Sequence, residues 1–149
     1  MSPFRSLLAA AALFAAVNAT AAADGGCMPR VRDGWLRLPP MRMPMLAGFG
    51  RIENGCAMPA TIVAASSAAF GSVELHETRI VDGVSRMRAV PALRLPPHGA
   101  ATMKPGALHL MLMQPRAPLQ AGSRVPVEFT LADGRKLLGE FEVRDHEAR

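Results

Sequence analysis

The chain has 149 residues, of which 50% are hydrophobic, and it carries a formal net charge of +5 at pH 7. This length is sufficient for one hydrophobic core, and thirteen Pro and thirteen Gly residues leave little room for long helices. The positive charge does not indicate a nucleic-acid-binding protein, because the basic residues are scattered and the chain has one Trp and no Tyr to stack on bases.

The N-terminus resembles a secretory signal peptide. One basic residue, Arg5, precedes the almost unbroken apolar run of residues 7–17, and small residues follow up to Ala23. The apolar run has about 11 residues, whereas roughly 20 are needed to span a bilayer. We therefore predict a signal peptide over residues 1–23, cleaved near Ala23, and a single exported domain over residues 24–149. We expect this domain to be periplasmic and to have no transmembrane segment.

Cys27 offers an alternative interpretation of the same region, which is lipidation of that cysteine after signal cleavage. A lipidation signal has an aliphatic residue three positions before the cysteine, whereas Asp24, Gly25 and Gly26 precede Cys27. The apolar run also ends well before this position. We therefore favour signal cleavage without lipidation.

The only two cysteines, Cys27 and Cys56, both lie in the predicted mature domain. A small, even number of cysteines in an exported protein indicates a disulfide bond. A bridge that closes a loop of about 30 residues stabilises a fold by roughly 3.5 kcal/mol in the chain-entropy model. The alternative is that one or both thiols bind a metal ion or exchange disulfides, but a redox-active pair usually has the closer C-x-x-C spacing. We favour the structural bridge.

Short strand-like segments separated by turn residues occupy the rest of the chain. Asp82-Gly83 and Asp133-Gly134 are hairpin signals, and hydrophobic residues alternate with polar ones over residues 125–131. This pattern predicts an all-β fold, a Greek-key β-sandwich or barrel. The predicted strands cover residues 31–38, 48–53, 61–65, 73–80, 84–89, 93–95, 100–103, 108–113, 125–131 and 136–143.

Two histidines and two methionines form a candidate metal-ligand set. Ten residues separate His76 from Met87, twenty-one separate Met87 from His109, and one separates His109 from Met111. Thioether sulfur is a poor ligand for hard or strongly hydrated ions, whereas Cu(I) accepts it readily. The set therefore predicts a site for one Cu(I) per chain.

The predicted strands place these side chains favourably. In residues 73–80, His76 lies on the face opposite Val73 and Leu75, which argues against a buried core histidine. In residues 108–113, His109, Met111 and Met113 share one face of the strand. A single methionine is more often a core residue than a ligand, so the evidence lies in the combination of all four positions.

The spacing H-x10-M-x21-H-x-M is that of the periplasmic copper chaperones of the PCuAC type, and residues 30–143 resemble this family. The resemblance extends to the blocks at residues 73–78, 87–90, 97–100, 103–113 and 119–126. It implies a cupredoxin-like β-sandwich in which His76, Met87, His109 and Met111 ligate one Cu(I). It also implies delivery of copper to the apo CuA domain of cytochrome c oxidase subunit II, or to another copper-transfer protein. We expect a monomer without enzymatic activity.

Other functions compete with copper delivery. One rival is copper sequestration for tolerance, which uses the same ligands. Another is an electron-transfer cupredoxin, but a blue-copper site needs a Cys thiolate, and neither cysteine lies in the ligand blocks. A third is a metal-free exported β-sandwich that binds another protein.

The sequence does not decide whether four further methionines add ligands to the site. Met41, Met43 and Met45 alternate in a proline-bounded stretch, and Met113 follows the His-x-Met pair. The stretch at 41–45 is interpreted either as a Met-rich lip or accessory Cu(I) site, or as a loop that packs its methionines on the core. We favour the loop, and we expect Met113 to be a packing residue first.

Overall fold

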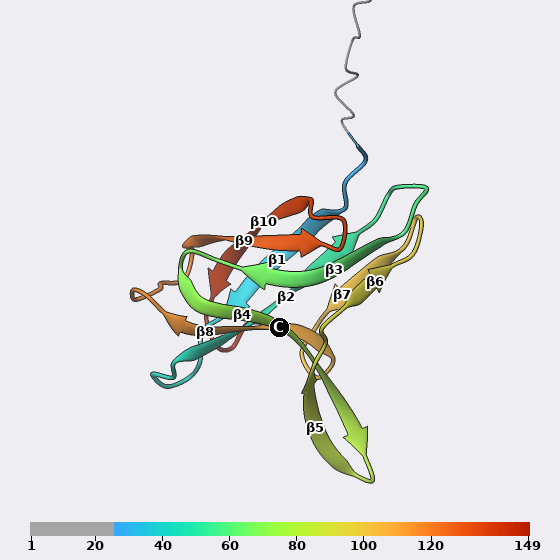
Figure 1. Cartoon of the computed structure of the whole chain (residues 1–149). Coiled ribbons are helices and arrows are strands. Elements are labelled where there is room, and N and C mark those ends of the chain that lie inside the picture. The colour runs from blue at the N-terminus through green and yellow to red at the C-terminus, as the bar shows by residue number, and fades with distance from the viewer. Residues whose placement is uncertain (1–25) are drawn as a thin grey trace, which may run out of the picture.

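The structure, a computed structural model, describes residues 26–149, so the predicted signal peptide lies outside the described residues. The described part consists of strands, turns and loops, and none of it is a helix long and apolar enough to cross a membrane. The strands are β1 (Arg30–Arg37), β2 (Met45–Glu53), β3 (Ala60–Ser66), β4 (Phe70–Val81), β5 (Val84–Ala89), β6 (Leu93–Leu95), β7 (Ala100–Met103), β8 (Leu108–Pro115), β9 (Arg124–Leu131) and β10 (Lys136–Arg144) (Figure 1).

Seven of these strands close into a barrel, in the order β4-β8-β2-β1-β10-β9-β3 and back to β4. The barrel closes where Ala65 of β3 pairs with Val73 of β4. The pairing of β1 with β10 is parallel, and the other neighbours are antiparallel. β6 and β7 extend the wall along β3 and β2, whereas β5 pairs with β4 alone and projects from the barrel as a hairpin (Figure 1). The prediction of an all-β fold is confirmed.

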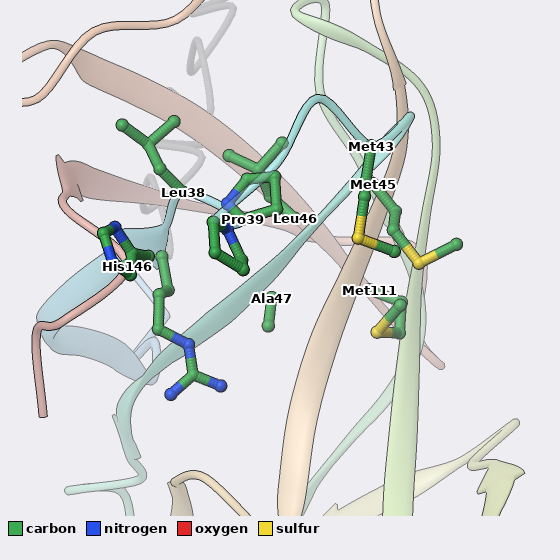
Figure 2. A pocket seen from close by; sticks show the side chains of 10 residues that line it. Leu38, Pro39, Met43, Met45, Leu46, Ala47, Met111 and His146 are labelled. Atoms are coloured by element: carbon green, nitrogen blue, oxygen red, sulfur yellow. The ribbon is translucent and has the colours of Figure 1, made fainter.

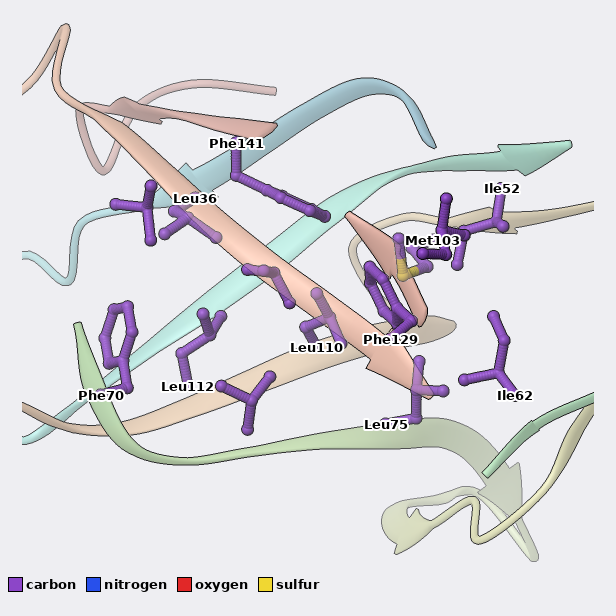
Figure 3. Close-up of a cluster of buried hydrophobic side chains, with 14 of the residues drawn as sticks. Leu36, Ile52, Ile62, Phe70, Leu75, Met103, Leu110, Leu112, Phe129 and Phe141 are labelled. Atoms are coloured by element: carbon purple, nitrogen blue, oxygen red, sulfur yellow. The ribbon is translucent and has the colours of Figure 1, made fainter. Parts of the chain in front are cut away.

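Alternating side chains of the strands fill the barrel. On β9 the hydrophobic positions from Val125 to Leu131 are buried, as their alternation with polar residues predicted. Phe129 faces Phe141 of β10, with ring centroids 6.4 Å apart, and both rings are fully buried (Figure 3). Burying a Leu or Phe side chain stabilises a fold by about 1.5–3 kcal/mol. This core is the rigid support on which the outer face of the barrel is built.

The strand that begins at Met45 corrects one prediction. We expected β2 to start at residue 48, because Pro44 and the alternating methionines indicate a loop. The structure continues the strand to Met45, which pairs with Met113 of β8. Nor do the methionines before the strand pack on the core, since Met41 and Met43 are 75% and 47% exposed. Pro44 is compatible with this strand because it stands just before the first ladder position.

Cys27 and Cys56 form a disulfide, with their Cα atoms 5.7 Å apart. The bond ties the segment before β1 to the loop after β2, and so confirms the predicted bridge. Asn54, 1% exposed, supports the same loop: its Nδ2 donates to the backbone carbonyls of Met58 and Pro96, at 2.8 and 3.1 Å, and its Oδ1 accepts from the Cys56 N–H at 3.1 Å. The bridge lies at the end of β2 that pairs with β7, away from the end that pairs with β8.

Candidate metal centre

Three neighbouring strands, β5, β4 and β8, carry the four predicted ligands. His76 of β4 stands directly opposite His109 of β8, and their ring centroids are 6.2 Å apart. In the same ladder Glu74 stands opposite Met111, and in the next one Thr78 stands opposite Met87. Residues paired directly across an antiparallel ladder project from the same face of the sheet. The four side chains therefore share the outer face of the barrel wall.

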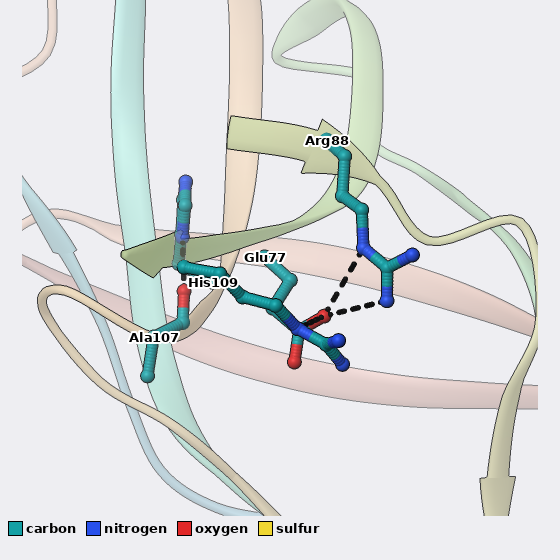
Figure 4. Close-up of polar contacts among 5 residues, drawn as sticks. Glu77, Arg88, Ala107 and His109 are labelled. Carbon is teal, nitrogen blue, oxygen red and sulfur yellow. Dashed lines mark hydrogen bonds and ion pairs between the residues drawn. The ribbon is translucent and has the colours of Figure 1, made fainter. Parts of the chain in front are cut away.

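His109 is held in one orientation. Its side chain is 5% exposed, and its Nδ1 lies 2.8 Å from the carbonyl oxygen of Ala107 (Figure 4). A carbonyl oxygen can only accept, so Nδ1 carries the proton and Nε2 keeps a free lone pair. The Phe49 ring packs beside the imidazole, with 6.5 Å between centroids. An imidazole fixed through its other nitrogen is the usual arrangement of a metal-ligating histidine.

His76 has the complementary arrangement. Its Nε2 lies 2.9 Å from Oε2 of Glu74, so this nitrogen carries the proton and donates a hydrogen bond to the carboxylate. Its Nδ1 is buried and has no hydrogen-bond partner among residues 26–149. An unpaired buried nitrogen is costly to a fold unless something else occupies its lone pair. Each histidine of the pair thus offers one nitrogen to a bound cation.

The two thioethers differ in their surroundings. Met111 is partly buried on β8, two residues beyond His109 and on the same face. Met87 is 55% exposed on β5, and its partner Thr78 is two residues from His76, so Met87 is a diagonal neighbour of that histidine. The structure therefore brings His76, His109 and Met111 together on the barrel and places Met87 on the adjoining hairpin.

The acidic groups nearby are already paired. Glu77 accepts hydrogen bonds from Arg79 and Arg88, which hold the pKa of its carboxyl below the usual value (Figure 4). No group of three or more His, Cys, Asp or Glu residues that could hold a metal ion is found within residues 26–149. The donor set around the histidine pair is thus nitrogen and thioether sulfur, which suits a soft monovalent cation rather than Mg²⁺, Ca²⁺ or Zn²⁺.

Glu74 is the residue that the sequence analysis missed. It lies two residues before His76 on the same strand face, and this spacing is the signal that could have identified it. Carboxylates that hold a ligating imidazole recur around metal sites.

Comparison with known proteins shows the family to which the chain belongs. Residues 30–143 match the model of the family described as putative lipoprotein LpqE-like. The chain belongs to this LpqE-like family. A putative lipoprotein of Leifsonia xyli subsp. xyli (strain CTCB07) is 37% identical over 91 residues, which are 60% of this chain and 55% of that protein. The LpqE-like chain therefore spans about half the length of this curated relative.

Solved structures with a similar fold include PCuAC domains. The copper-bound PCuAC domain of PmoF2 superposes with a TM-score of 0.64 at 20% identity, over 78% of this chain and 92% of that one. Cu(I)-bound DR1885 of Deinococcus radiodurans gives a TM-score of 0.65 at 26% identity, over 82% and 83%. The predicted cupredoxin-like fold of this LpqE-like chain is thereby confirmed.

Proposed function

We propose that this LpqE-like protein is an exported, periplasmic Cu(I) metallochaperone that binds one copper ion through His76, Met87, His109 and Met111. The observation that carries the proposal is the facing pair His76–His109, each ring with one nitrogen free, beside the thioether of Met111. The likeness to a copper-bound PCuAC domain and to Cu(I)-bound DR1885 supports it. No turnover chemistry is proposed, since copper is the cargo.

The ligand set explains how the ion is held and released. Two neutral nitrogens and two thioethers satisfy Cu(I), whereas Zn²⁺ takes imidazole but not thioether. The half-exposed Met87 is the ligand that a partner's side chain reaches first, so transfer proceeds by exchange of one ligand at a time. Both cysteines are joined to each other, so neither offers the thiolate that a blue-copper electron-transfer site requires.

Leu in place of Met87 is expected to weaken Cu(I) binding by about tenfold, equivalent to roughly 1.4 kcal/mol, because one thioether is lost. Stability should change by less than about 0.5 kcal/mol, since the side chain is exposed on a hairpin. Anaerobic competition against a colorimetric Cu(I) chelator measures the affinity, and thermal unfolding measures the stability. Met58→Leu is the matched control, because Met58 is 72% exposed and lies outside the four positions. Equal affinities of the two variants would remove Met87 from the ligand set.

The proposed recipient is the apo CuA domain of cytochrome c oxidase subunit II, or another copper-transfer protein. We expect the Cu(I)-loaded protein, mixed anaerobically with an apo CuA domain and then separated from it, to leave its copper on the recipient. The copper content of each separated protein is the measurement. Copper that stays on the loaded protein would favour the alternative, sequestration for copper tolerance.

A further inference from the structure

Three thioethers line one pocket beside the proposed copper centre. Met43, Met45 and Met111 all belong to the lining of this pocket, together with Arg37 and His146. Figure 2 shows the side chains of the three methionines gathered at one end of the pocket, whereas His146 lies at the other end. Met111 comes from β8, Met45 is the first residue of β2, and Met43 lies just before that strand, so the fold brings together thioethers far apart in sequence.

The pairing of β2 with β8 places these thioethers on the face of the histidine pair. Ala47 stands opposite Met111, and Met45 is two residues before Ala47 on the same side of β2. Met43 precedes Met45 by another two residues and is 47% exposed. Met111 therefore lies between two groups of donors. His109 and His76 are on one side, and Met43 and Met45 are on the other.

Packing does not account for Met43, which lies just before β2. A methionine that fills the core is buried, whereas Met43 is among the exposed large hydrophobic residues. The pocket offers no carboxylate for a hard ion, because Arg37 and His146 are the polar side chains of its lining. The guanidinium of Arg37 lies 5.0 Å from the centre of the Phe49 ring. Three neutral thioethers suit Cu(I), and the nearby positive charge keeps such a site weaker than the histidine centre.

We propose that Met43, Met45 and Met111 form a capture site for Cu(I), from which the ion passes to the histidine pair. The inference rests on the proposed function, since it takes the histidine pair as the destination. In the transfer, the Cu–S bonds to Met43 and Met45 break as Cu–N bonds to His109 and His76 form. Met111 keeps its bond to the ion throughout. The ion stays Cu(I), and no proton or electron is exchanged with a further reactant.

The first test is the rate of copper uptake in the double variant Met43→Leu/Met45→Leu. Stopped-flow mixing with a Cu(I)–chelator complex should show uptake slowed by about fivefold or more, because the ion is no longer concentrated beside its destination. The equilibrium affinity of the tight centre should stay within about twofold, since His76, Met87, His109 and Met111 remain. Met41→Leu/Met58→Leu is the matched control, because both residues are exposed and lie outside this pocket.

The second test uses methyl NMR of the His109→Gln variant, labelled at its methionine methyl groups, because the weakened tight centre leaves the ion at the capture site. On addition of Cu(I), the methyl signals of Met43, Met45 and Met111 should shift, while that of Met41 stays in place. Unchanged Met43 and Met45 signals with an unchanged uptake rate in the double variant would overturn the capture site while leaving the proposed function intact. A wild-type protein that shows no tight Cu(I) binding at all would instead overturn the proposed function.

Discussion

Replacing His109 with Ala should lower the affinity for Cu(I) by at least about a hundredfold. Mutating only a residue that hydrogen-bonds to a metal ligand typically lowers metal affinity 10–100-fold, and here the ligand itself is removed. The side chain is almost fully buried, its Nδ1 is held by the Ala107 carbonyl, and its ring faces His76. No other imidazole lies on this part of β8, so the lost nitrogen has no substitute on that strand. Anaerobic titration against a Cu(I) chelator measures the loss.

Two further variants distinguish the loss of a ligand from an effect on folding. Replacing buried His109 by Ala also leaves a cavity, so His109→Gln is tested beside it, because the Gln amide can still donate to the Ala107 carbonyl. The control is His98→Asn in an exposed loop, where the backbone φ of 51° is one that Asn tolerates. If His109→Gln folds and keeps wild-type affinity, His109 is not a ligand.

Removing the disulfide should produce the largest loss of stability. The double variant Cys27→Ala/Cys56→Ala is expected to lose about 3–4 kcal/mol of unfolding free energy, because the unfolded chain regains the entropy of the open loop. For a domain of this size the loss lowers Tm by roughly 10 °C. Thermal and denaturant unfolding measure both quantities.

Copper binding should survive the same change. The cysteines lie before β1 and after β2, whereas the proposed ligands lie on β4, β5 and β8. The folded double variant is therefore expected to bind one Cu(I) with wild-type affinity in the chelator titration. A folded variant that loses the copper would contradict a purely structural bridge and would make the thiols candidate ligands.

The bridge also bears on the lipoprotein names of the family and of the Leifsonia relative. A lipid is attached to a cysteine through its sulfur, and the Sγ of Cys27 is bonded to that of Cys56. In the disulfide-bonded protein this sulfur is already used. Membership of the family therefore does not by itself make Cys27 a lipid anchor.

Local sequence signals predicted most of the wall of the barrel. The Asp-Gly turns and the alternation on β9 marked strands that the structure confirms, since turn geometry and a one-sided strand are both properties of a few consecutive residues. The closure was not predictable in this way, because the parallel pairing of β1 with β10 joins the two ends of the domain. The start of β2 was missed because proline is depleted in strands and the residues after Pro44 carry no strong strand signal, whereas the pairing with β8 extends the strand to Met45.

For the candidate site too, some features could be predicted from the sequence and others depend on the fold. The spacing predicted four candidate ligands, which remain a prediction. Alternation along β8 placed His109 and Met111 on one face, as the structure shows. The hydrogen bonds of the two imidazoles depend on the fold, because Ala107 and Glu74 act on the rings only through the turn before β8 and the local course of β4. The place of Met87 also depends on how far the β4–β5 hairpin extends beyond the barrel.

The four candidate ligands are not held equally firmly, because Met87 lies on the β4–β5 hairpin and the other three lie on the closed wall of the barrel. β5 pairs with β4 alone, and all six of its residues are exposed, so its hydrogen bonds open at a lower cost than those of the closed wall. Fraying of this hairpin withdraws the thioether of Met87 while the wall holds His76, His109 and Met111 in position. In the proposed function, the coordination number of the ion is then controlled by a local opening. Under that proposal, the copper site becomes three-coordinate, and ready for hand-over, without any disturbance of the barrel core.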